Sequence, residues 1–285
     1  MKALTIQQFF KKFPNDNVCL THLFNTRFEK DHQCPKCSKK GKWYLLKSEK
    51  AFSCGGCGHH IHPMVNTIFE NSSTSLQLWF YAIYLFTTTR SGVSAKELER
   101  QLGVTYKCAW RMGHKIREYM ADIDGNNKLT GIIEADETYV GGVRKGTRGR
   151  GAKNKSIVFG VVQKNGDIIT KVVDNVKAKS LQPIIENNVK KGSEIQSDEL
   201  RSYWGLDKKG FTHKTVNHGR GEYVSKAGAT VNSVEGFWAR LKLSIKGTHI
   251  HTSKKHLSKY VGEFEYRFNS RLSPEKMFEE LLTGF

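Results

Sequence analysis

The stretch GIIEADETYVGG (residues 131–142) has the pattern of a buried β-strand that carries three carboxylates, Glu134, Asp136 and Glu137. Side chains of a strand alternate between its two faces, so Glu134 and Asp136 share one face and Glu137 takes the other. Burying a lone carboxylate is costly unless a cation neutralises it. The stretch therefore predicts a strand that holds carboxylates within a sheet and not at its solvated end.

Two more acids occupy comparable positions. Asp198 ends a second expected strand, SEIQSD (193–198), and Glu235 lies at the start of an expected helix, NSVEGFWARLK (232–242). Three carboxylates from two strands and a helix can hold two Mg²⁺ or Mn²⁺ ions about 3.5–4 Å apart, which suits phosphodiester chemistry. We expect these two acids and Asp136 to form such a site.

Each of the three acids also has a structural alternative. Asp136 could pair with a lysine at a sheet edge, and Asp198 could cap the helix that follows it. Glu235 could close a capping box that begins at Asn232. These alternatives stay open for each acid taken singly, and it is the joint pattern that favours a metal site.

The segments around these acids predict a mixed sheet flanked by helices, an α/β or α+β domain. Lys164, Asn165 and Gly166 form a short hairpin turn between two of the strands. The expected elements are strands at 131–140, 156–163, 167–176, 193–198 and 212–218, a helix at about 180–190 and a helical tract from residue 232 onward.

Four of the six cysteines form the pairs CPKC and CGGC, with 16 residues between the pairs. This spacing is typical of a closed four-cysteine site for one structural Zn²⁺. Residues 42–47 and 51–54 read as a hairpin between the pairs, which predicts a zinc ribbon. The expected ligands are Cys34, Cys37, Cys54 and Cys57.

Two disulfides are the alternative to zinc in this segment. We disfavour them because disulfides are rare in reducing compartments, where this chain is expected to reside. The remaining thiols, Cys19 and Cys108, are expected to be ordinary packing residues.

A helix-turn-helix is predicted after the ribbon. Ser94 can cap a first helix in a capping box with Glu97, and Gly103 allows a tight turn. Residues 105–119 then form a basic second helix, the expected recognition helix. The alternative is a plain helical hairpin with a solvated basic face. A preceding helix, at about 75–88, is apolar on nearly all sides.

The charge balance points to an anionic partner. The 285-residue chain has 46 Lys and Arg against 27 Asp and Glu, for a formal net charge of +19. Such a balance is typical of nucleic-acid binding and says nothing about fold. No secretory signal is evident, and the most apolar window, 76–86, is far shorter than the roughly 20 residues of a membrane span. We expect a cytoplasmic protein without a membrane partner.

Basic residues in three segments are expected to contact DNA phosphates. They are the recognition helix, the Gly-rich segment 143–155 between the first two strands, and the tract 240–256 beside Glu235. Segment 143–155 is either a phosphate clamp or a solvated tip, and its place beside Asp136 favours the clamp. The expected contacts are Lys107, Arg111, Lys115, Arg144, Lys145, Arg148, Arg150, Arg240, Lys242 and Lys246.

Two groups of residues near Glu235 are given no metal or base-stacking role. His249, His251 and His256 have a spacing that fits no dedicated metal site, so we expect phosphate contact from them. The neighbouring aromatic pair Phe237 and Trp238 is assigned to the core.

These features predict three domains. Residues 1–70 hold an N-terminal helix and the zinc ribbon, residues 71–124 form the helical DNA-binding domain, and residues 125–285 form the sheet domain. The polar stretch DIDGNNK (122–128) marks the second boundary.

The order of the motifs resembles that of a known family. Zinc ribbon, helix-turn-helix, EADETYVGG (134–142), SDELRSYWGL (197–206) and the long block from residue 232 follow one another as in bacterial insertion-sequence transposases of the DDE type with an N-terminal zinc ribbon. The resemblance covers nearly the whole chain and is most specific in its C-terminal block.

The resemblance implies a ribonuclease H-like catalytic fold in which Asp136, Asp198 and Glu235 are the catalytic triad and bind two Mg²⁺ per active site. Their separations of 62 and 37 residues suit members without a domain inserted before the last acid. Some relatives have Asn in place of the third acid, whereas this chain has Glu. Glu137 and Glu199 match the motif as neighbours of the triad and not as ligands.

The implied reaction is Mg²⁺-dependent cleavage at insertion-sequence ends, followed by transfer of the 3′-hydroxyl into target DNA. The implied partners are double-stranded DNA, both terminal inverted repeats and target, and a second copy of the chain in a homodimer or higher oligomer. The implied location is the bacterial cytoplasm, at the nucleoid.

Two rival functions stay open. A zinc-ribbon and helix-turn-helix DNA-binding regulator would have the same basic charge but would need no triad. A ribonuclease H-fold nuclease without strand joining would need the triad, yet would have little use for two separate DNA-reading modules.

Overall fold

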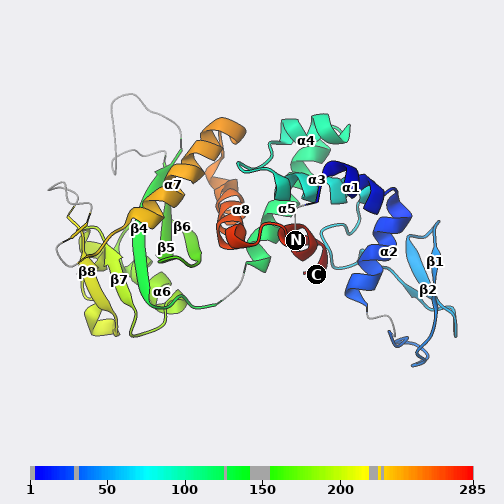
Figure 1. Ribbon diagram of the computed structural model, residues 1–285, viewed down its shortest axis with the longest axis horizontal. Coiled ribbons are helices and arrows are strands. Elements are labelled where there is room, and N and C mark those ends of the chain that lie inside the picture. Colours follow the sequence, from blue (N-terminus) through cyan, green and yellow to red (C-terminus); the bar gives the residue numbers. More distant parts are fainter. Residues whose placement is uncertain are drawn as a thin grey trace. The chain divides into compact units, whose positions relative to one another are not determined.

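The chain forms two compact units in this computed structural model, Met1–Tyr119 together with Ser273–Phe285, and Met120–Leu272 (Figure 1). The last residues of the chain therefore belong to the N-terminal unit. The three-domain division at residues 70 and 124 stays a prediction. The described residues are 4–28, 32–124, 127–141, 155–217, 224–225 and 228–284.

The N-terminal unit is mostly helical and includes one small sheet. Helix α5 begins in this unit and ends in the next. The elements are helices α1 (Ile6–Lys12), α2 (Asp16–Arg27), α3 (Leu76–Thr88), α4 (Ala95–Leu102), α5 (Tyr106–Ile123) and α9 (Met277–Thr283), and strands β1 (Trp43–Leu46), β2 (Ala51–Cys54) and β3 (His60–Ile61).

Aromatic rings fill the core of this unit. Trp79 and Phe80 of the apolar helix α3 are fully buried, which confirms the helix expected at 75–88. Phe13, after α1, lies edge-on to Phe80 at 5.1 Å between ring centroids, and Phe9 lies 6.0 Å from Phe278 of α9. Within the part of the chain that the structure describes, no helix is both long and apolar enough to cross a bilayer.

The zinc-ribbon hairpin is confirmed. β1 and β2 pair antiparallel over the two segments that the sequence predicted, and β3 adds a third strand on the far side of β2. With two residues, β3 is too short for an alternating pattern to reveal it.

Two helices joined at a glycine follow, as expected. The Ser94 hydroxyl accepts the backbone N–H of Glu97 at 3.1 Å, but the Glu97 carboxylate turns to Arg100 instead of closing the expected capping box. Gly103 ends α4 in the left-handed conformation, with φ of 65°. Helix α5 continues to Ile123, beyond the end expected at residue 119.

The second unit contains the predicted mixed sheet. Asn165 at φ 60° and a 2.8 Å bond from the Gly166 N–H to the Gln163 carbonyl confirm the hairpin turn. The elements are strands β4 (Ile132–Val140), β5 (Ser156–Gln163), β6 (Ile168–Val173), β7 (Glu194–Ser197) and β8 (Thr212–Thr215), and helices α6 (Ala178–Asn188), α7 (Asn232–Ser244) and α8 (Leu257–Asn269).

The strand order of this sheet is β6-β5-β4-β7-β8. The first strand, β4, is central; it pairs antiparallel with β5 and parallel with β7, and β8 extends the parallel half. A central first strand with an antiparallel hairpin on one side and two parallel strands on the other is the ribonuclease H-like arrangement that was expected.

Helices cover both faces of the sheet. The core that includes Val140 packs against α7 and α8, whereas the core that includes Ile133 packs against α6. Alternation along β4 therefore directs Glu134 and Asp136 toward α7 and Glu137 toward α6. The face assignment from the sequence is confirmed.

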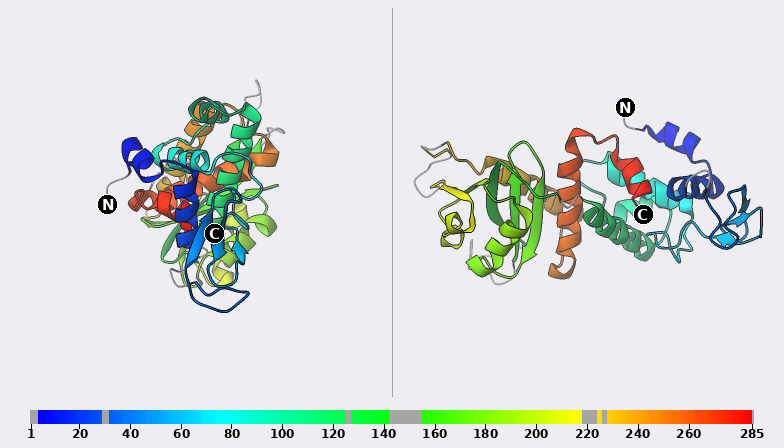
Figure 2. Two further views of the ribbon diagram at one scale, coloured as in Figure 1. Left: turned by 90° about the vertical axis from the view of Figure 1, so that its right-hand side faces the viewer. Right: turned by 90° about the horizontal axis from the view of Figure 1, so that it is seen from below.

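Helix α8 runs beside the edge strand β6 (Figure 2) and satisfies part of its backbone. Asn269 accepts the Ile168 N–H at 2.8 Å and donates to the Ile168 carbonyl at 3.0 Å. Glu265 accepts the Thr170 N–H at 2.8 Å as well as the Thr170 hydroxyl. These bonds occupy groups that an open edge would offer to a foreign strand.

The half-buried Glu265 should make stability depend on pH. Desolvation raises its pKa from 4.5 to about 7, and the nearby Asp124 acts in the same direction, against the bonds from Thr170. The folded state therefore binds more protons than the unfolded state between about pH 4.5 and 7, so stability falls as pH rises through that window. Between about pH 4.5 and 7, the free energy of unfolding of the parent protein should fall by at most about 3 kcal/mol relative to that of Glu265→Gln.

Urea unfolding of both proteins at several pH values checks this expectation. A parent-to-variant difference that stays constant from pH 4.5 to 7 would contradict it.

Candidate functional site

Asp136 and Asp198 are brought side by side by two parallel strands. β4 and β7 pair in register up to Ala135 and Ser197, so the next positions along the strands are Asp136 and Asp198. The charge of Asp198 contributes to raising the pKa of Asp136, as expected for carboxylates at neighbouring strand ends.

The Asp136 carboxylate is largely desolvated. Desolvation raises its pKa to about 7, and the charges of Glu137 and Asp198 push it in the same direction. Its Oδ2 accepts a 3.0 Å hydrogen bond from Nε1 of Trp238, which favours the charged form. Desolvation and these two like charges together disfavour the ionised form of Asp136, which a bound cation would stabilise.

Glu235 lies on α7, which packs on β4. It is exposed and stands one helical turn before Trp238, so both side chains lie toward the same side of the helix. Among the described residues, the four ribbon cysteines are the one set of three or more possible ligands whose ligand atoms all lie within 4.8 Å.

The structure also decides the capping alternatives. Asn232 is the first residue of α7, and the N-cap, Val231, makes no side-chain bond, so the capping box proposed for Glu235 does not form. Asp198 is not the N-cap of the short 3₁₀-helix that follows it, since that residue is Leu200, but its carboxylate accepts a 3.0 Å bond from the Leu200 N–H within the turn after β7.

The other two acids of β4 have protein partners. Glu137 accepts a 3.0 Å hydrogen bond from the Tyr203 hydroxyl on the α6 side of the sheet. Glu134 is fully buried and is hydrogen-bonded to the segment that begins α7. Asp136 is therefore the acid of this strand best placed to meet a cation.

Trp238 is a site residue that sequence reasoning missed. It is buried, as expected of a core residue, but its indole N–H also orients Asp136. Gly160 of β5 pairs with Asp136, and a Cβ on Gly160 would lie 2.8 Å from the indole ring. A glycine inside a strand often marks a close approach, so Gly160 was the available signal.

Gly160→Ala should destabilise the sheet unit because the indole has to move away from β5 and Asp136. We expect a loss of about 1–3 kcal/mol, as for other overpacked cores. Denaturant unfolding measures it, with Gly236→Ala as the matched control, since a Cβ on that glycine of α7 meets nothing within 4 Å. Equal stabilities of the two variants would contradict the expectation.

Basic residues of the C-terminal tract lie on and after α7. Arg240, Lys242 and Lys246 are exposed. The pKa of Lys242 is lowered, mainly by desolvation and in part by the charge of Lys155. The charge of Asp136 acts in the opposite direction. Lys242 therefore lies near Asp136, and Lys155 lies near Lys242.

Helix α5, the expected recognition helix, presents fewer basic side chains than predicted. Lys107 and Arg111 are exposed in its first turns. Lys115 is half-buried and donates to the Ile68 carbonyl at 3.2 Å, and Arg117, part of the expected basic face, is buried. Of these four basic residues of α5, only Lys107 and Arg111 are exposed.

The Gly-rich clamp between β4 and β5 falls almost wholly outside the described residues. The expected contacts that lie there are Arg144, Lys145, Arg148 and Arg150.

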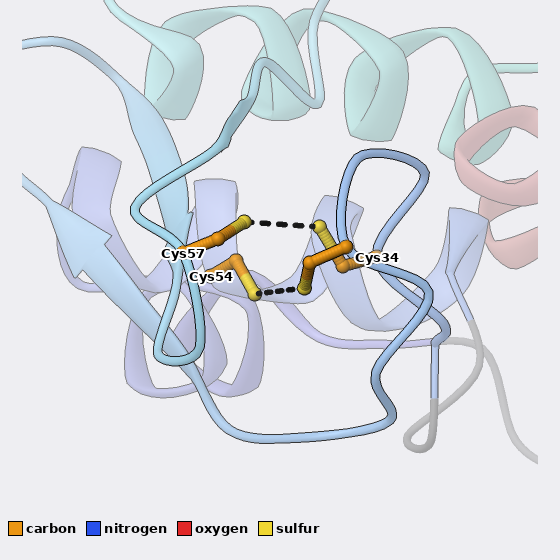
Figure 3. Close-up of side chains that lie close together, drawn as sticks. Cys34, Cys54 and Cys57 are labelled. Atoms are coloured by element: carbon orange, nitrogen blue, oxygen red, sulfur yellow. Dashed lines mark hydrogen bonds between the residues drawn. The ribbon is translucent and has the colours of Figure 1, made fainter.

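The four ribbon cysteines converge. The Sγ atoms of Cys34 and Cys57 are 3.7 Å apart and those of Cys37 and Cys54 are 3.9 Å apart (Figure 3). A disulfide bond is about 2.05 Å long, so these are separate thiols. All four sulfurs lie within 4.8 Å of one another, as the ligands of one tetrahedral Zn²⁺ do. The predicted structural zinc site is supported.

The other two thiols take no part in this site. Cys19 is buried in α2, and desolvation raises its pKa to about 12. Cys108 is half-buried, and its sulfur lies 3.2 Å from the Thr74 hydroxyl. Both are packing residues, as expected.

Comparison with protein families matches two segments of the chain. Residues 128–269 match the ISXO2-like transposase domain, and residues 14–60 match the transposase zinc-ribbon domain. An uncharacterized protein in transposable element ISH50 of Halobacterium salinarum is 27% identical, over 90% of this chain and 92% of that protein. A transposase-like protein of Haemophilus influenzae is 33% identical, over 36% of this chain and 81% of that protein.

Among solved structures, similarity is remote. A pre-cleavage Mos1 transpososome has a TM-score of 0.29 at 11% identity, over 67% of this chain and 73% of that one. A Mos1 transposase paired-end complex with the left transposon end has a TM-score of 0.28 at 12% identity, over 72% of this chain and 78% of that one. The fold assignment therefore depends on the strand order and not on these matches.

Proposed function

The chain belongs to the DDE-type transposases that combine a zinc-ribbon domain with an ISXO2-like transposase domain, and from this premise we propose its reaction. It cleaves DNA at the ends of an insertion sequence and transfers the freed 3′-hydroxyl into target DNA, in a reaction that depends on Mg²⁺. The observation that carries this proposal is the desolvated Asp136 on the central strand, with Asp198 beside it and α7 packed over them.

The residues present fit a pair of hard divalent cations. Carboxylate oxygens are the ligands that Mg²⁺ prefers, and the raised pKa of Asp136 reflects desolvation together with the charges of Glu137 and Asp198. Asp136, Asp198 and Glu235 would hold two Mg²⁺ or Mn²⁺ ions. When bound, such ions activate a water or hydroxyl and stabilise the leaving oxygen of a phosphodiester.

The chain itself supplies orientation and charge. The Trp238 N–H holds Oδ2 of Asp136, so that carboxylate keeps one orientation during the reaction. Lys242, whose charge acts on Asp136, can donate a charge-assisted hydrogen bond to a phosphate oxygen next to the acids. Cleavage and joining then differ in the attacking group, water or the 3′-hydroxyl, and need no covalent enzyme intermediate.

DNA recognition is assigned to the N-terminal unit. Lys107 and Arg111 lie in the first turns of α5, where a recognition helix meets base edges and phosphates. The formal charge of +19 supports a polyanionic partner, which we take to be the terminal inverted repeats and the target duplex. Because two element ends must be paired, the active form is a homodimer or a higher oligomer.

The proposal is tested with Asp136→Asn, which keeps an oxygen for the Trp238 N–H but removes the charge. The substrate is a duplex with the repeats that flank the coding region, incubated with Mg²⁺. We expect cleavage and joining to fall by at least about a thousandfold, roughly 4 kcal/mol, with DNA binding unchanged. Asp174→Asn is the control, because Asp174 is 87% exposed and paired with Lys254 at the surface.

Other results would favour the rival functions. Cleavage without joining by the parent protein would indicate a nuclease. Specific DNA binding without Mg²⁺-dependent cleavage by the parent protein would indicate a regulator.

A further inference from the structure

Helix α7, which carries Glu235, begins without a cap of its own. Its N-cap residue is Val231, whose side chain has no acceptor, and its first turn contains one acid, Glu235 itself. The first N–H groups of any helix need acceptors from outside that helix. Here the acceptor comes from the central strand of the sheet.

The acceptor is Glu134. Its Oε2 accepts the backbone N–H groups of Ser233 at 2.7 Å and Val234 at 3.1 Å. Its Oε1 accepts the hydroxyls of Thr230 at 2.9 Å and Ser233 at 3.1 Å. Ser233 and Val234 are the second and third helical residues, the positions whose N–H groups an ordinary N-cap side chain would satisfy.

These four bonds account for the burial of Glu134, which has no exposed surface. Both carboxylate oxygens accept two bonds each, so this acid has little capacity left to bind a metal ion directly. Its negative charge also lies at the positive end of the α7 dipole, where it is stabilising.

A second strand holds the same segment. Gln196 of β7 is the register partner of Glu134, and its Oε1 accepts the Thr230 N–H at 2.8 Å. Its own Nε2 donates to Glu194 at 2.6 Å, which fixes the orientation of the amide. Thr230 is thus bonded to two neighbouring strands just before α7 begins.

The spacing connects these bonds to the proposed site. Glu134 lies two residues before Asp136 on β4 and therefore shares its face, and Gln196 lies two residues before Asp198, which directly follows β7. The N–H groups that Glu134 accepts belong to the two residues directly before Glu235. The register pair Glu134 and Gln196 therefore fixes the start of α7, and with it Glu235, relative to Asp136 and Asp198.

We propose that Glu134 is a positioning residue that sets the place of Glu235 in the metal site, an inference that rests on the proposed function. A misplacement of about 1 Å is enough to weaken a site built from several elements. Residues that orient ligands typically change metal affinity by about 10–100-fold when they are replaced.

The test is a double-mutant cycle on the zinc-loaded protein, read out as Mn²⁺ affinity by isothermal titration calorimetry without DNA. Glu134→Gln and Glu235→Gln should each weaken Mn²⁺ binding by about tenfold or more. In the Glu235→Gln background, Glu134→Gln should have no further effect beyond about twofold, because it acts through Glu235.

Glu263→Gln is the matched control for mere loss of stability. Glu263 is also fully buried, but on α8, where it pairs with Arg267 at 2.8 Å. We expect this variant to unfold at a lower denaturant concentration and yet to bind Mn²⁺ as the parent protein does. If Glu134→Gln fails to fold, Thr230→Val removes one of the four donors, and we expect it to weaken Mn²⁺ binding by about threefold.

Three outcomes would overturn the inference. Parent-like Mn²⁺ affinity in Glu134→Gln, or in Thr230→Val where that variant replaces it, would leave Glu134 a purely structural cap. If the two substitutions weaken Mn²⁺ affinity by factors that multiply in the double variant, Glu134 acts independently of Glu235. If Glu235→Gln alone leaves Mn²⁺ affinity unchanged, the proposed metal site itself is wrong, and the inference fails with it.

Discussion

The contact on which the sheet unit depends is the one between the buried Glu134 carboxylate and the first turn of α7. A buried carboxylate without donors is strongly destabilising, and so is a buried helix N-terminus without acceptors. Here the N–H groups of the helix N-terminus donate to the buried carboxylate, so each supplies the partner that the other lacks. The bonded residues are 99 and 100 positions apart in the sequence. Because β4 also carries Asp136 and α7 also carries Glu235, the bonds that hold the fold together hold the proposed site together as well.

The three acids of β4 differ in how far the protein satisfies them. Glu134 has four donors, and Glu137 has the Tyr203 hydroxyl on the opposite face. Asp136 has the Trp238 indole, but desolvation and two like charges raise its pKa to about 7. We take this shortage of compensation at Asp136, and not the number of acids in the motif, as the mark of the proposed cation site. The same principle separates structural from functional carboxylates on other buried strands.

Much of this organisation could be predicted from the sequence because it depends on local spacing. Period-two alternation assigned Glu134 and Asp136 to one face, and the CPKC and CGGC pairs identified the zinc ribbon. Long-range contacts could not be predicted in this way. The bond between Trp238 and Asp136 joins residues 102 apart, and nothing in the sequence near either residue records it. Burial of Arg117 was missed for a related reason, since a basic residue on a helix has the same local pattern whether it faces solvent or core.

We expect the sheet and α7 to form one metal site together. Anomalous diffraction from crystals soaked in Mn²⁺ tests this expectation most directly. The predicted result is two Mn²⁺ peaks about 3.5–4 Å apart, bound by Asp136, Asp198 and Glu235, with Glu134 still bonded to the start of α7. Mn²⁺ bound by Glu134, or an absence of Mn²⁺ between Asp136 and Asp198, would contradict the account.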